Sequence, residues 1–121
     1  MVIARIESLV LKAGIDDALQ RADAYVTAGA DGVMIHSKEK DPDEVYTFLN
    51  RFKRKHPAIP SVVVPTNYCS ATEEQLRQAG ANIVIYANHL IRSAYPSMVR
   101  AAKSILTHRR AAEADRESCM S

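Results

Sequence analysis

The stretch Val2-Ile3-Ala4-Arg5-Ile6-Glu7-Ser8 predicts the first strand of the fold. Its opening is apolar and rich in β-branched residues, which is typical of a buried strand. Arg5 and Glu7 then place opposite charges two positions apart, and residues two apart in a strand project from the same face. Such a pair at one end of an apolar strand is either a structural ion pair or part of a polar site where the strand leaves the core.

Three further apolar runs predict strands, and helical patterns separate them. The strands are expected at residues 32–36, 61–66 and 82–86. The first helix shows apolar spacing from Ile15 to Val26, and the second follows an N-cap at Asp41-Pro42. A short third helix is expected to begin at a capping box, either Ser70 with Glu73 or Thr72 with Gln75. Pro96 is expected to divide the last helix into a short and a longer piece.

This alternation predicts an α/β fold of four parallel strands joined by right-handed crossovers. The segments Ala28–Ile35 and Ala79–Tyr86 repeat the same order of helix end, glycine and strand. A (β/α)8 TIM barrel has eight such units in about 250 residues. The sequence therefore indicates half of a barrel or a small open sheet over residues 1–108, followed by a loose polar tail at 109–121.

Composition limits the classes of function. The 121 residues suit one modest domain with a single core, and 47% hydrophobic with 25% charged residues is an ordinary globular balance. A net charge of +2 gives no indication of nucleic acid or an acidic membrane surface as a partner. No apolar run has the roughly 20 residues of a membrane span, and the start does not resemble a signal peptide. Cys69 and Cys119 are expected to be free thiols of a reduced, cytoplasmic protein.

Polar residues follow every predicted strand. They are Arg5 and Glu7, His36 and Ser37, Thr66 and Asn67, and Asn88 and His89. The carboxyl ends of parallel strands lie on one rim, where ligands bind, so these side chains predict an anion site. Arg5 is suited to hold a carboxylate or phosphonate in a bidentate fork. Taken singly, His36 could be a satisfied buried histidine, Thr66 a turn residue and Asn88 a helix cap.

The sequence offers no motif for a resident metal or a covalent nucleophile. None of the four histidines has the helical partner or nearby carboxylate of a zinc site. A glycine-rich phosphate loop and a Gly-x-Ser-x-Gly elbow are also absent from the sequence. We therefore expect no metal ligands in this chain.

The strand-end motifs resemble those of the phosphoenolpyruvate mutases, within the isocitrate lyase superfamily. The matching stretches, in order, are Val2–Ser8, Ala28–Lys38, Val62–Thr66 and Ile83–His89, and His36–Glu44 is especially similar. The resemblance implies a Mg²⁺-dependent TIM barrel, a homo-oligomer, that interconverts phosphoenolpyruvate and phosphonopyruvate in phosphonate biosynthesis. It also implies that Arg5 and His36 are catalytic and bind substrate, with Ser37, Thr66 and Asn88 as further substrate-binding residues and Glu7 in support.

The resemblance covers the C-terminal half of that barrel only. In the family, the acidic metal ligands and the gating loop come from the N-terminal half. We therefore expect a chain that is inactive alone and is completed by the missing half-barrel or by self-association. Two alternatives stay open: part of a phosphonopyruvate hydrolase, which shares these strand ends, and a non-catalytic half-barrel that closes by homodimerisation.

Overall fold

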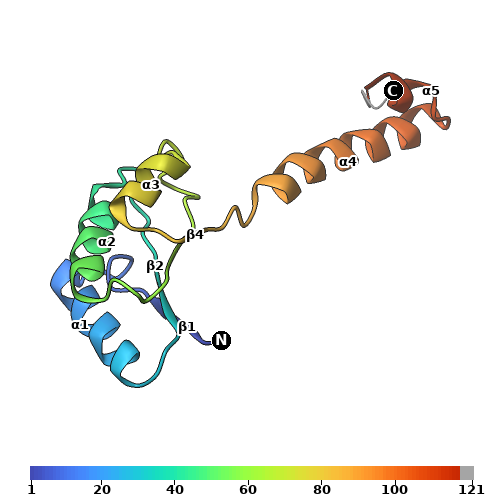
Figure 1. Cartoon of the computed structure of the whole chain (residues 1–121). Coiled ribbons are helices and arrows are strands. Elements are labelled where there is room, and N and C mark those ends of the chain that lie inside the picture. The colour runs from blue at the N-terminus through green and yellow to red at the C-terminus, as the bar shows by residue number, and fades with distance from the viewer. Residues whose placement is uncertain (118–121) are drawn as a thin grey trace. The chain divides into compact units, whose positions relative to one another are not determined.

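The structure, a computed structural model, describes residues 1–117 and contains two compact units (Figure 1). The first, Met1–Ala87, contains β1 (Ile3–Ile6), α1 (Gly14–Thr27), β2 (Gly32–Ile35), α2 (Asp43–Lys55), β3 (Ser61–Val63), α3 (Glu73–Ala79) and β4 (Ile83–Val84). The second begins at Asn88 and contains α4 (His89–His108) and α5 (Ala112–Glu117).

The four strands form a parallel sheet in the order β1-β2-β3-β4. Arg5 lies opposite Met34, and Met34 lies opposite Val62. In an open doubly wound sheet the strand order reverses at one point and helices cover both faces, whereas a sequential order keeps the helices on one face. Figure 1 shows α1, α2 and α3 to one side of the strands. The prediction of four parallel strands alternating with helices, as in half of a TIM barrel, is confirmed.

The core of the first unit lies between the sheet and these helices. Ile6, Val33, Ile35 and Val63 contribute from the strands, and Ala18, Ala22, Val45, Phe48, Leu49, Phe52 and Leu76 from the helices, each with 1% or less of its surface exposed. The rings of Phe48 and Phe52 stack with centroids 5.7 Å apart. The buried strand residues face the helices. The alternate residues, Arg5 among them, therefore project from the opposite face of the sheet, which the helices do not cover and which is called the uncovered face below.

The helix boundaries follow the sequence signals closely. The capping box is formed by Thr72 and Gln75, the second of the two predicted pairs. Asp41 accepts a hydrogen bond from the backbone N–H of Asp43 at 2.9 Å, and α2 begins one residue later than its predicted start at Pro42.

The second unit differs from expectation in two places. α4 is one continuous helix with Pro96 inside it, not two pieces. Proline removes one backbone donor, and the hydroxyl groups of Ser93 and Ser97 donate to the carbonyls of His89 and Ser93 in the same turns. The expected loose tail contains a helical turn and a half, α5. Cys119 lies outside the described residues. Among residues 1–117, no helix is both long enough and apolar enough to cross a membrane.

Candidate functional site

Arg5, Glu7 and His36 come together at the carboxyl end of β1 and β2. Pairing of Ile6 with Ile35 is extended by a bond from the His36 N–H to the Ile6 carbonyl at 3.3 Å. This register places Glu7 beside His36, on the same face as Arg5. The charges of both Arg5 and Glu7 act on the His36 imidazole, which places the three side chains in one electrostatic environment.

Arg5 forms an ion pair with Glu7 through its Nε atom. The side chains remain 52% and 39% exposed, so the pair lies at the surface of the uncovered face rather than in the core. An exposed pair of this kind adds little to stability. Glu7 instead restrains the direction of the guanidinium, whose partly exposed end is open to an anionic group.

His36 is partly buried, and its Nδ1 atom is buried without a hydrogen-bond partner among residues 1–117. The pKa of His36 is lowered from 6.5, first by burial and then by the positive charge of Arg5; Glu7 opposes this effect and Lys38 adds to it. This lowering of the pKa favours the neutral imidazole at pH 7. A histidine with both nitrogens satisfied by the protein, the alternative raised above, is not what the described residues form.

Ser37 faces the opposite way. It is 1% exposed, and its hydroxyl donates to Oε1 of Glu44 in the first turn of α2. The Ser37 hydroxyl oxygen also accepts from the backbone N–H of Glu39, at 3.0 Å. The structure thus directs Ser37 toward the helix layer, while its neighbour His36 is directed toward the uncovered face.

The third strand supplies one contact to this rim. The side-chain amide of Asn67 donates to the Lys38 carbonyl at 3.1 Å. Thr66 lies in the same turn, where its backbone N–H donates to the Val64 carbonyl at 2.8 Å. Asn88 belongs to the second unit, where it stands at the N-cap of α4 without a side-chain cap bond.

The sequence analysis missed two contacts near the rim. Lys12, in the turn after β1, forms an ion pair with Glu39, and Glu44 accepts from Ser37. Lys12 has a positive φ of 59°. The sequence does not predict this conformation, because a positive φ is uncommon for residues other than glycine. The Glu44 contact joins residues seven positions apart, across a loop and a helix start.

Within residues 1–117, no group of three or more His, Cys, Asp or Glu side chains is placed to hold a metal ion. At the rim, the carboxylate of Glu7 is paired with Arg5. These residues do not by themselves fit a Mg²⁺ site.

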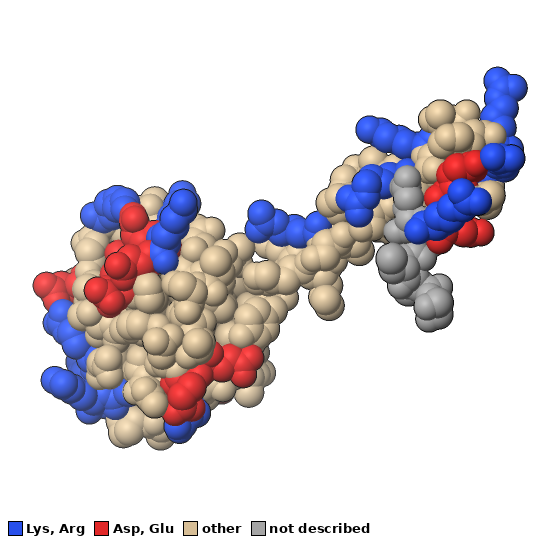
Figure 2. All heavy atoms as spheres, turned by 90° about the horizontal axis from the view of Figure 1, so that it is seen from above, with Lys and Arg blue, Asp and Glu red and all other residues tan. Residues whose placement is uncertain are grey.

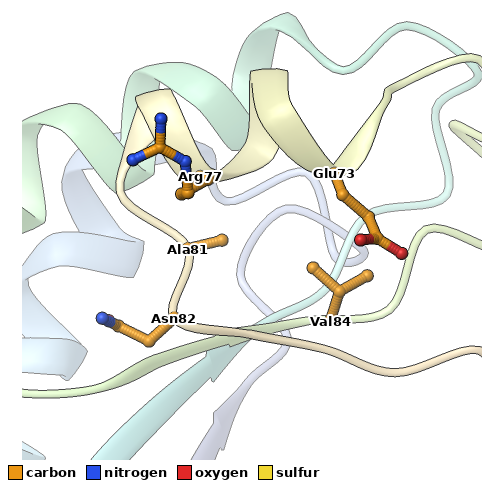
Figure 3. Close-up of a pocket in the computed structure, with 5 residues that line it drawn as sticks. All are labelled: Glu73, Arg77, Ala81, Asn82 and Val84. Atoms are coloured by element: carbon orange, nitrogen blue, oxygen red, sulfur yellow. The ribbon is translucent and has the colours of Figure 1, made fainter.

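A groove of about 280 Å³ lies elsewhere, between α3 and β4 (Figure 3). Its lining consists of Glu73, Arg77, Ala81, Asn82 and Val84, and none of the predicted site residues takes part. Figure 2 shows acidic and basic side chains side by side on the visible surface of the first unit. The exposed charge on that surface is therefore of both signs. The polar residues predicted to bind a ligand lie at the rim.

The chain can be compared with known proteins. The family model for phosphoenolpyruvate phosphomutase matches residues 1–106. The chain belongs to the phosphoenolpyruvate phosphomutase family. A phosphoenolpyruvate phosphomutase of Tetrahymena pyriformis is 39% identical over 104 residues, and a phosphonopyruvate hydrolase of a Variovorax strain is 43% identical over 95 residues.

Solved structures of the family agree. A phosphoenolpyruvate phosphomutase from Streptomyces platensis subsp. rosaceus superposes with a TM-score of 0.84 at 43% identity, covering 92% of this chain and 38% of that one. A phosphonopyruvate hydrolase in complex with oxalate and Mg²⁺ superposes with a TM-score of 0.81 at 37% identity, covering 96% of this chain and 40% of that one.

The sequence alignments also cover most of this chain but only a small part of each relative. The Tetrahymena alignment covers 86% of this chain and 34% of the relative, and the Variovorax alignment covers 78% and 32%. The chain therefore spans about a third of the length of these relatives.

Proposed function

We propose that the chain supplies the Arg5–His36 part of an active site that interconverts phosphoenolpyruvate and phosphonopyruvate. The observation that carries this proposal is the rim itself: a half-exposed guanidinium held by Glu7 beside a neutral histidine with a buried, unpartnered nitrogen. Both named substrates are anions with a carboxylate and a phosphorus group. Arg5 would neutralise this charge, and His36 would hydrogen-bond the transferring group without adding charge.

The metal ligands and the gating loop would come from outside residues 1–117. Mg²⁺, which is present in the related hydrolase structure, would be held by carboxylates of the other barrel half and would stabilise the charge of the phosphoryl group. Thr66 and Asn88 would contact substrate only in a closed barrel. On this proposal the chain alone has no mutase activity. Exposed, unpaired Cys69 supports a reducing compartment, and we place the protein in the cytoplasm of a phosphonate-producing cell.

A hydrolase is the second candidate, because the Variovorax hydrolase is as similar to the chain as the mutases are: 43% identical over 95 residues, against 39% over 104 residues for the Tetrahymena mutase and 43% for the Streptomyces platensis structure. The two activities share the proposed roles of Arg5 and His36. They differ in whether water reaches the reacting phosphorus group, which is controlled by parts of the barrel outside this chain.

The test is reconstitution. The chain is mixed with a separately produced N-terminal half-barrel of a related mutase, and phosphonopyruvate consumption is followed with Mg²⁺. Phosphoenolpyruvate as product supports a role of the chain in a mutase site. Because the N-terminal half controls access of water, the same mixture is made with the N-terminal half of a phosphonopyruvate hydrolase and assayed for pyruvate and free phosphate; higher turnover with that half supports the hydrolase. A folded complex without activity would favour the non-catalytic half-barrel. Turnover that survives Arg5→Ala would contradict the role proposed for Arg5. Turnover by the purified chain alone would contradict the proposed division of the site.

A further inference from the structure

The segment that follows β2, residues 37–40, is fastened to each of its neighbours. From α2, Glu44 accepts the hydroxyl hydrogen of Ser37. From the turn after β3, Asn67 donates to the Lys38 carbonyl at 3.1 Å. From the turn after β1, Lys12 pairs with Glu39. Of these contacts, only the one to Glu44 is made by a fully buried side chain, since Ser37 is 1% exposed.

The buried contact acts on His36 through the backbone that the two neighbouring residues share. Adjacent residues at a strand end project to opposite faces, so fixing Ser37 toward α2 fixes the backbone that directs His36 toward the uncovered face. A hydroxyl that donates to a carboxylate forms a charge-assisted bond, which is shorter and stronger than a neutral one. The same hydroxyl oxygen accepts from the Glu39 N–H, so the hydroxyl donates to α2 and accepts from the loop.

We propose that Glu44, acting through Ser37, is a positioning residue that holds His36 for the reaction. This inference rests on the proposed function only for its kinetic consequence, because the orientation of His36 can be measured without activity. It also gives Ser37 a different part from the one expected from the sequence: Ser37 supports His36 from behind instead of contacting substrate.

The test uses the full chain with four substitutions. Ser37→Ala and Glu44→Ala remove the contact from either side. Glu44→Gln keeps an acceptor oxygen at the same place and serves as the conservative rescue. Asp43→Ala is the matched control, because it removes a carboxylate from the same first turn of α2 at an exposed position.

The readout is the His36 ring signal in proton–carbon NMR, assigned with His36→Gln and titrated with pH. The charged groups that act on this ring are Arg5, Glu7 and Lys38, and none of them is altered. Ser37→Ala and Glu44→Ala are expected to release the ring toward solvent, so its titration midpoint rises toward 6.5. Glu44 is not among these charged groups, and removing a negative charge could only lower the midpoint, so a rise in Glu44→Ala reports repositioning of the ring and not loss of the Glu44 charge. Glu44→Gln and Asp43→Ala should titrate as the unaltered chain does.

In the reconstituted enzyme, the same two alanine variants should lower kcat on the order of 10- to 100-fold with little change in KM, since misplacement of a catalytic group affects the chemical step. If reconstitution gives no activity, the NMR result still decides the inference. Identical His36 titrations in Ser37→Ala, Glu44→Ala and Asp43→Ala would overturn it. If one alanine variant does not fold, the other and Glu44→Gln provide the comparison.

Discussion

Glu7 holds Arg5 through the Nε atom, and both side chains remain partly exposed at the carboxyl end of β1. An exposed ion pair that is not part of a network adds little to stability. Here the carboxylate engages one edge of the guanidinium and leaves the rest of it available. The pair thus combines orientation with access, which is what a substrate-binding arginine requires.

Arg5→Ala should reduce turnover in the reconstituted barrel by about 10²-fold or more, because one preorganised donor to developing charge has that effect. Arg5→Lys should recover part of the loss, since it keeps the charge but not the planar fork. Arg21→Ala is the control, because Arg21 pairs with Asp17 on the exposed surface of α1, at 2.7 Å. Equal losses in Arg5→Ala and Arg21→Ala would indicate a general effect on folding or assembly.

His36 should titrate below 6.5, and the charges of Arg5 and Glu7 should move its titration midpoint in opposite directions. Arg5→Gln removes a positive charge that disfavours the imidazolium, so the midpoint should rise. Glu7→Gln removes a negative charge that favours it, so the midpoint should fall further. NMR titration of each variant measures this directly. Shifts of the same sign in both variants would contradict the opposing effects of these two charges on the His36 ring.

The lowered pKa of His36 also has a consequence for stability. The unfolded chain binds a proton at His36 more readily than the folded chain does, so the unfolding free energy should decrease as the pH falls below 6.5 and through the lower folded value. Urea unfolding on either side of 6.5, in the unaltered chain and in His36→Gln, isolates this contribution. The pH dependence should be weaker in His36→Gln; an unchanged dependence would assign it to other groups.

Strand ends could be found from the sequence, but the roles of neighbouring residues there could not. The apolar runs and the glycines located β1 to β4, and hence the polar rim. The apolar periodicity did not predict that the Ser37 side chain points toward Glu44 while the His36 side chain points to the uncovered face. That arrangement depends on a contact across the loop between β2 and α2. Pro96 was expected to divide the last helix, yet one missing backbone donor is tolerated within α4.

The repeated helix-end glycines allow a matched comparison. Gly29 and Gly80 have φ values of 98° and 116°, where a side chain costs about 1–2 kcal/mol. A Cβ at Gly29 would meet nothing within 4 Å, whereas one at Gly80 would lie 2.6 Å from Cγ of Lys53. Gly80→Ala should therefore lower the urea midpoint more than Gly29→Ala does. Adding Lys53→Ala to Gly80→Ala should reduce the difference; if it does not, the extra cost lies in the backbone.

The edges of the sheet provide the last prediction. Within the described residues, β1 and β4 each pair on one side only, and an unpaired parallel edge invites another strand. The two edges belong to the same chain, so a second copy can offer β1 to β4 and β4 to β1. Sedimentation of the chain alone should then show a compact, concentration-dependent dimer.

Ile83→Lys distinguishes edge pairing from other association. Ile83 lies in β4 and is 43% exposed, and a lysine there should raise the dimer dissociation constant roughly tenfold or more, because an unpaired charge in an interface costs more than about 1.4 kcal/mol. Leu106→Lys is the control, since Leu106 is an exposed apolar residue of α4, at 77%. A dimer that only Leu106→Lys disrupts would assign association to the helix, and a monomer at all concentrations would leave edge closure to the N-terminal half-barrel.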